Sequence, residues 1–187
     1  MAQKPQKGDE IIDLVNEKDM IIKGISRRKA HNNPSFLHRE IGILLIDQQN
    51  RILLQKRSKN KSYPGMWVIS AGGHIPQGQN IKEQAHKELY EELGFDTEIK
   101  FLHKEFESGS HESHFIYWFI ANYTNQQIKP NPEEVETTKF VSQDSLRNLF
   151  KDFDLETHKK PFYNQHSVLA FNICNYYWHS ISKNDKN

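Results

Sequence analysis

The chain is poor in cysteine: Cys174 is the single one in 187 residues. One thiol excludes an intramolecular disulfide and is typical of proteins in a reducing compartment. Long apolar runs are also missing, since no segment approaches the ~20 residues of a membrane span. The opening MAQKPQKGDE lacks the apolar stretch of a signal peptide. We therefore expect a cytoplasmic protein without membrane contact.

An excess of charge of one sign is absent as well. The 25 Lys and Arg residues nearly balance 24 Asp and Glu, for a formal net charge of +1. A basic nucleic-acid footprint is therefore not expected. Hydrophobic residues make up 36% and aromatic residues 11%, enough for one substantial core at this length. We predict a disordered lead-in at 1–9 and a single domain over 10–187.

The apolar pattern predicts an α+β protein. Strands are expected in hairpins over 10–25 and 38–56, at 67–70, at about 96–107 and 114–123, and near 138–141. A glycine-rich loop follows the strand at 67–70. Helices are expected at 81–93, from Gln143, and near 164–182.

The helix over 81–93 has clear ends. Asn80 is a good N-cap residue and Glu83 follows three positions later, as in a capping box. Gly94 provides the stop. Apolar residues recur every four positions between them, at Ile81, Ala85, Leu89 and Leu93.

Three acids, Glu88, Glu91 and Glu92, fall within one turn of this helix and border its apolar stripe. Carboxylates held together near a core repel one another unless a cation neutralises them. Their hard oxygen atoms suit Mg²⁺ or Mn²⁺, which also bridge to substrate phosphates. The alternative from spacing alone is a solvated surface helix with Lys87 paired to its acidic neighbours.

The segment GHIPQGQNIKEQAHKELYEELGF (73–95) resembles the signature of the Nudix family. Its fixed positions are matched by Gly73, Glu88, Leu89, Glu91, Glu92, Gly94 and Phe95. Gln79 and Lys87 depart from it, standing where the family has Glu and Arg. The resemblance implies a mixed β-sheet sandwiched between helices (an α/β/α sandwich) with an N-terminal hairpin. It also implies Mg²⁺ or Mn²⁺ at the three glutamates, with Lys87 beside them in the catalytic set.

Other segments, among them LLQKRS, YPGMW and GGHIPQG, are similar to the Nudix branch of isopentenyl-diphosphate isomerase. That isomerase needs a cysteine acid/base group where this chain has Gly72, and a strand glutamate where our alignment places His114. The expected activity is therefore Mg²⁺-dependent hydrolysis of a diphosphate linkage in a nucleoside-diphosphate-type or related small molecule. Isomerisation, and a catalytically weak nucleotide-binding domain, remain the alternatives.

The same resemblance implies a second metal site. His31, His38 and His74 match the metal-binding histidines of the isomerase, and Glu112 and His114 are the candidates to complete the set. Imidazole-rich sites suit Zn²⁺ and other transition metals. Histidines that lie on the surface or only form hydrogen bonds are the alternative.

Substrate contacts are expected from the matching positions Arg27 and Arg57 for the diphosphate, Gly73 in the loop, and Phe162 as a pocket aromatic. A later acidic loop offers Glu133, Glu134 and Glu136 as further ligand or base. The partner expected is a small-molecule diphosphate. The oligomeric state stays open, with a homodimer as one option.

Overall fold

A computed structural model describes residues 10–149 and 165–184 of the chain. Its main feature is a seven-stranded mixed sheet in the order β5-β4-β3-β8-β7, with β6 also pairing β3 and β9 also pairing β4. The central strand β3 runs parallel to β8. The strands are β3 (His38–Ile46), β4 (Ile52–Arg57), β5 (Trp67–Val68), β6 (Ala71–His74), β7 (Ile99–Ser108), β8 (Ser113–Asn122) and β9 (Val135–Val141).

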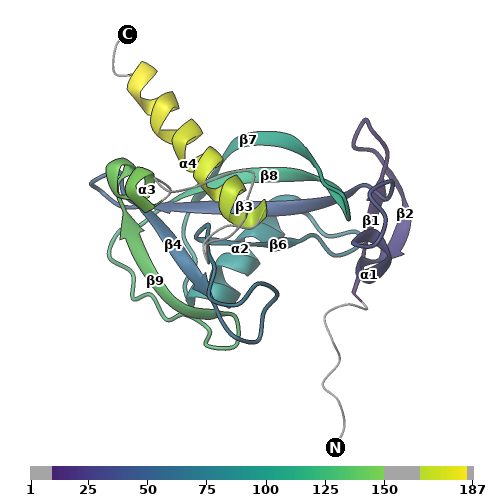
Figure 1. Ribbon diagram of the computed structural model, residues 1–187, viewed down its shortest axis with the longest axis horizontal. Helices are drawn as coiled ribbons and strands as arrows, with labels where there is room; N and C mark the ends of the chain where they lie inside the picture. The colour runs from purple at the N-terminus through teal and green to yellow at the C-terminus, as the bar shows by residue number, and fades with distance from the viewer. Residues whose placement is uncertain (1–9, 150–164, 185–187) are drawn as a thin grey trace, which may run out of the picture.

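Helices cover both faces of this sheet (Figure 1). Alternate residues of a strand point to opposite faces, so Ile41, Ile43 and Leu45 pack with helix α2 (Ile81–Leu93). Leu44 and Ile46 join the core under helix α4 (Gln165–Asn184). The short helix α3 (Gln143–Leu149) contacts α4. The α+β fold class, with a mixed sheet between helices, is confirmed.

Helix α2 has the ends that its sequence predicts. The Asn80 side chain accepts hydrogen bonds from the backbone N–H groups of Lys82 and Glu83, at 2.9 and 3.2 Å. Gly94 ends the helix with φ 80°, the left-handed conformation that glycine adopts without a steric penalty. The position of the three acids on the helix therefore follows from local sequence.

The expected N-terminal hairpin is confirmed as β1 (Ile11–Val15) and β2 (Ile21–Ser26), which form a separate two-stranded sheet. Two other expectations were wrong. Residues 71–74 were expected in a loop, yet they form β6, because backbone pairing with β3 needs no side-chain pattern. Strand β9 begins at Val135, earlier than expected, because it continues along β4. The short helix α1 (Arg27–Ala30) was not predicted.

None of the helices within residues 10–149 and 165–184 combines the length and apolar character needed to cross a bilayer.

The hairpin is fixed to the main sheet through Asp19, whose side chain is buried. Its carboxylate accepts hydrogen bonds from Arg39 Nε at 2.6 Å, from Lys104 Nζ at 3.1 Å, and from the Tyr117 hydroxyl. Burial alone would raise the pKa of Asp19, but the bonds from Tyr117, Arg39 and Lys104 outweigh it and lower that pKa. The ionised carboxylate therefore stabilises the docked hairpin.

We predict that Asp19→Asn lowers the free energy of unfolding by about 2–3 kcal/mol, because Arg39 and Lys104 lose their partner. Asn tolerates the positive φ of 61° at this position, so the backbone is not the cause of the loss. The stabilisation by Asp19 exists above the ordinary Asp pKa of about 3.9 and is lost as the pH falls through its lower folded value. Denaturant melts of both proteins at pH 7 and pH 3 measure this. A difference that stays the same at the two pH values would contradict it.

Candidate active site

A cavity of about 620 Å³ opens between the β6 end of the sheet, helix α2 and the segment after β2. Charged groups of both signs line it. The acidic ones are Glu10, Glu40, Glu88, Glu91 and Glu112, and the basic ones are Arg27, Arg57, Lys61 and Lys87, with His31, His74 and His111 beside them. Opposite charges from separate elements thus share one pocket.

Helix α2 approaches the sheet closely at Gly73 of β6. A Cβ on Gly73 would lie 2.7 Å from Oε1 of Glu88, so the carboxylate occupies the space that a side chain would take. Gln84 Nε2 donates a hydrogen bond of 2.8 Å to Glu88 and fixes its direction. The missing side chain of Gly73 therefore brings an acid of α2 to the cavity wall.

Glu92 is the most buried acid of the helix, at 3% exposure. It accepts hydrogen bonds from Gln55 Nε2 at 2.7 Å and from the backbone N–H of Gly72 at 3.2 Å. Burial and the nearby charge of Glu88 raise the pKa of Glu92 from its ordinary 4.5 to about 8. A cation beside the two acids would lower that pKa again, which is the electrostatic property of a metal-binding carboxylate.

The third acid, Glu91, lies at the mouth of the cavity and is half-exposed. Its ion-pair partner is Lys87, 3.8 Å away one turn earlier on α2. In the Lys87 position the family has Arg, which can hold a carboxylate with two parallel hydrogen bonds. Lys87 offers a single point charge in place of that planar group, and both Lys87 and Glu91 line the cavity.

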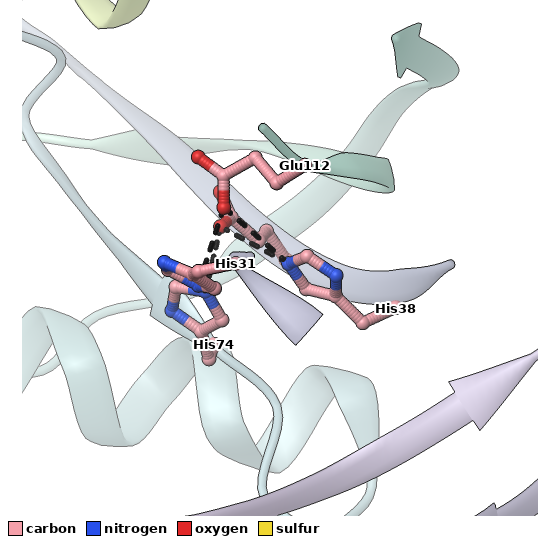
Figure 2. A group of neighbouring side chains, drawn as sticks. His31, His38, His74 and Glu112 are labelled. Carbon is pink, nitrogen blue, oxygen red and sulfur yellow. Dashed lines mark hydrogen bonds and ion pairs between the residues drawn. The ribbon is translucent and has the colours of Figure 1, made fainter. Parts of the chain in front are cut away.

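A second cluster of metal-binding groups comes from four segments. His31, His38, Glu40, His74 and Glu112 each offer a ligand atom, and these atoms all lie within 4.8 Å of one another. His31 Nε2 lies 2.6 Å from His74 Nε2 and 3.2 Å from Glu112 Oε2. Figure 2 shows the labelled His31, His38, His74 and Glu112 converging on one point.

Two histidines of this cluster, His31 and His74, are in the neutral form that binds metals. Burial and the charge of Arg27 lower the pKa of His31 to about 4, and burial lowers that of His74 to about 3. Near neutral pH both rings are uncharged. Burial and the charge of Glu40 raise the pKa of Glu112, so the two carboxylates repel each other. A divalent cation would remove that repulsion.

Four buried polar atoms at this cluster have no hydrogen-bond partner: His38 Nε2, Glu112 Oε2 and both ring nitrogens of His114. Unpaired polar atoms are uncommon in protein interiors and each needs an explanation. Three imidazoles and two carboxylates directed at one point match the ligands of a transition-metal ion. The residues present therefore fit such an ion.

Sequence reasoning missed Glu40 and placed His114 in its role. Glu40 Oε1 lies 2.8 Å from His74 Nε2, whereas His114 is a neighbour whose Nε2 lies 3.8 Å from Glu40. Both residues sit on the same face as His38, because His38 pairs with His114 and Glu40 follows His38 by two. The alternation of β3 is the signal that would have identified Glu40.

Three cationic side chains from outside α2 line the same cavity as the acids. Arg27 and Arg57 were expected there, and Lys61 was not. Lys61 pairs with Glu134 at 2.5 Å, and Lys56 pairs with Glu136 at 2.7 Å. Glu133, the other acid of that loop, accepts a hydrogen bond from Asn60 at 3.1 Å. Phe162, the expected pocket aromatic, lies outside the described residues.

Comparison with known proteins identifies the fold family. Residues 36–165 match the family model of the NUDIX domain, which is well over half of the chain. The chain therefore belongs to the Nudix family.

Similar proteins carry two kinds of name. The isopentenyl-diphosphate Delta-isomerase of Streptomyces griseus is 32% identical over 144 residues, covering 73% of this chain and 73% of that protein. A Listeria monocytogenes protein named an uncharacterized Nudix hydrolase is 29% identical over 139 residues, covering 73% and 82%. The crystal structure of DR0079 from Deinococcus radiodurans shares the fold, with a TM-score of 0.70 at 20% identity over 88% of this chain and 99% of that one.

We predict that Glu92→Gln stabilises the protein in the presence of a chelator, and increasingly so at higher pH. With a raised pKa, Glu92 in the folded state holds a proton that the unfolded chain releases, so its contribution to stability is lost as the pH rises from 4.5 towards about 8. The amide removes this loss. Melting temperatures with chelator at pH 6 and pH 9 measure the effect, with roughly 2–4 °C expected for each kcal/mol.

The matched control is Glu83→Gln, an exposed acid on the first turn of the same helix. It should change the melting temperature equally little at both pH values. If Glu92→Gln behaved like this control, Glu92 would be ionised in the metal-free protein and our account of its environment would be wrong.

Proposed function

We propose that this Nudix protein is a Mg²⁺-dependent hydrolase that cleaves a diphosphate linkage in a nucleoside diphosphate or a related small molecule. The observation that carries the proposal is the lining of the cavity. Glu88 and Glu91 of α2 line the same cavity as Arg27, Arg57 and Lys61, which come from other segments of the chain. A diphosphate needs both a cation held by carboxylates and direct contacts with basic side chains.

In this proposal each residue has a defined task. Glu88 and Glu92 hold the Mg²⁺ or Mn²⁺, and Glu91 completes the set from the mouth of the cavity. When bound there, the ion polarises the phosphorus and lowers the pKa of an attacking water. Arg27, Arg57 and Lys61 bind the phosphate oxygens and orient the scissile bond.

The Glu92 carboxylate has a second task. With a pKa raised to about 8 in the metal-free protein, it is able to hold a proton near neutral pH. Its two donors, Gln55 and the Gly72 N–H, both bond to the same oxygen, Oε2, and keep it in a fixed position. Release of this proton accompanies cation binding, so the affinity for Mg²⁺ should increase with pH.

The histidine–glutamate cluster is proposed to hold a transition-metal ion such as Zn²⁺. Its ligands are His31, His38, His74, Glu40 and Glu112, with His114 as a neighbour that supports Glu40. The ion joins the loop after α1, two strands and the segment before β8. Because four of its ligands, His31, Glu40, His74 and Glu112, also line the cavity, it would contribute positive charge where the diphosphate binds.

Isomerisation of isopentenyl diphosphate is the second candidate, favoured by the names of the relatives. The geometry at Gly72 opposes it. A Cβ at this position would lie 2.6 Å from the carbonyl oxygen of Ile41, in the paired strand β3. Backbone atoms would have to shift to admit the cysteine on which the isomerase depends.

The proposal is tested by incubating the protein with Mg²⁺ and a panel of diphosphates while phosphate or monophosphate release is measured. We expect hydrolysis of at least one member and a loss of at least roughly 100-fold in Glu92→Gln. Incorporation of deuterium from D₂O into isopentenyl diphosphate, without phosphate release, would replace the hydrolase by an isomerase. Tight binding of a panel member without turnover would identify a binding domain.

We predict that Gly72→Cys produces no isomerase and destabilises the protein by about 1–3 kcal/mol, the usual cost of overpacking. Denaturant melts and the deuterium assay measure the two effects. The control is Gly78→Cys: Gly78 also lies in the 72–80 segment, but a Cβ there has no atom within 4 Å. Its positive φ of 72° adds strain, so a Gly72 variant that is less destabilised than this control would contradict the close approach of Ile41.

We predict that Glu40→Gln releases the transition metal. The purified wild-type protein should contain close to one equivalent by elemental analysis, and the variant roughly tenfold less after dialysis. The histidine control is His86→Ala, since His86 lies on α2, does not belong to the cluster and pairs with Asp96 at 2.7 Å. A wild-type protein that carries no metal and melts at the same temperature with and without Zn²⁺ would show that the histidines form only hydrogen bonds.

A further inference from the structure

Strand β7 forms an edge of the main sheet. It is 10 residues long and pairs with β8 on one side, and within the described residues no strand pairs with its other side. A long edge strand presents a row of unpaired N–H and C=O groups, which is a template for another strand. The question is what covers it.

Two aromatic residues of β7 are exposed to an unusual degree, Phe101 at 59% and Phe106 at 50%. An odd spacing would normally place them on opposite faces. The register shift between Phe101 and His103 inserts one extra residue and brings both rings to the same face. Phe101 stands opposite Phe119 of β8, and Phe106 stands opposite Phe115. Phe115 and Phe119 both lie on the face of β8 that packs with α2. The rings of Phe101 and Phe106 therefore lie on that face too.

The charged residues of β7 follow a complementary order on the opposite face. Lys100 stands opposite Ile120, His103 opposite Trp118, and Glu105 opposite Ile116. Glu107 stands opposite His114 on the same face. From one end of the strand to the other, basic residues come first and acidic residues follow.

We infer that a second copy of this chain pairs with β7, antiparallel and about a two-fold axis at Lys104, in a register that skips Leu102 as the pairing of β7 with β8 does. This register places Phe101 of each copy beside Phe106 of the other on one face. On the other face it places Lys100 beside Glu107 and His103 beside Glu105. The contact is isologous, with the same surface used by both copies.

The residue on the axis does not oppose this arrangement. Lys104 meets its own counterpart, but its Nζ lies 3.1 Å from Asp19 Oδ2 in its own chain. The buried carboxylate of Asp19 thus compensates the charge. The same ion pair holds the β1–β2 hairpin, which carries Asp19, against strand β7.

An apolar groove beside the edge supplies further contact area. It has a volume of about 920 Å³ and is lined by Met20, Ile22 and Leu37 together with Phe106 and Phe115. Phe106 belongs both to this groove and to β7, so Phe101 of the other copy would lie at its opening. Met20 and Ile22 are 56% and 58% exposed in the single chain.

Charges on an edge strand also occur as a protection against pairing. A protective set works by repulsion and has no reason to be complementary under a two-fold axis. In β7 three pairs match under one axis: the rings of Phe101 and Phe106, the opposite charges of Lys100 and Glu107, and the imidazole of His103 with the carboxylate of Glu105, which also accepts a hydrogen bond from Trp118 Nε1 at 2.6 Å. A second copy is therefore the partner that fits this edge.

The first test is sedimentation velocity of the full chain at roughly 50 μM, well above a micromolar Kd. We expect a dimer for the wild type and at least a roughly tenfold weaker dimer for Phe101→Asp. Tyr90→Asp is the matched control, because Tyr90 is 63% exposed on α2, away from the edge, and should leave the dimer unchanged. A monomeric wild type, or a dimer that persists in Phe101→Asp, overturns the inference.

The second test concerns register. Lys100→Glu should weaken the dimer about fivefold or more, and the double change Lys100→Glu/Glu107→Lys should restore it. Lys104→Cys should form a disulfide-linked dimer on mild oxidation, since directly opposite Cβ atoms lie about 4.5–5.5 Å apart. The native Cys174 is 0% exposed and does not compete. Equal cross-linking of Tyr90→Cys, or no rescue by the double change, rules out this axis.

Discussion

The approach of helix α2 to strand β6 is the constraint on which the site depends. It requires a residue without a side chain at Gly73, because Glu88 occupies the place of a Cβ there, and Glu92 accepts the N–H of the neighbouring Gly72. A larger residue at Gly73 would push the helix away from the sheet and the acids away from the cavity. The neighbouring Gly72 likewise has no room for a thiol, because a Cβ there would meet the Ile41 carbonyl oxygen. The packing of α2 and β3 against β6 thus positions Glu88 and Glu92 and opposes a cysteine at Gly72.

Buried carboxylates give the cavity its electrostatic character. The pKa of Glu92 is raised to about 8, and the pKa of Glu112 is also raised, because Glu112 is buried and lies near the charge of Glu40. Around them the rings of His31 and His74 stay neutral, so they do not neutralise the acids. Such an arrangement is unfavourable for a metal-free protein and favourable for one that binds cations. The two acidic groups and the basic side chains are complementary to a metal-bound diphosphate.

The sequence predicted those parts of the protein that local signals determine. Helix α2 could be bounded from Asn80 and Gly94, and the acids Glu88, Glu91 and Glu92 could be placed on one turn, because caps and spacing are local. Strand β6 was missed, since glycines carry no hydrophobic pattern and its pairing partner lies about 30 residues earlier in the chain. Glu40 and Lys61 were missed for a related reason. The alternation of β3 could have placed Glu40 on the face of His38. That this face meets His74 and Glu112, and that Lys61 lines the cavity, depends on how segments far apart in the sequence pack together.

The central claim is that one cavity holds two cations, one at the glutamates of α2 and one at the histidine–glutamate cluster, with a diphosphate between them and the basic side chains. Anomalous diffraction from a crystal grown with Mn²⁺ and a non-hydrolysable diphosphate tests it directly. Our account predicts one peak beside Glu88 and Glu92, a second among His31, His38, Glu40, His74 and Glu112, and phosphate density against Arg57 and Lys61. Metal peaks only on the outer surface, with the diphosphate bound elsewhere, would contradict it.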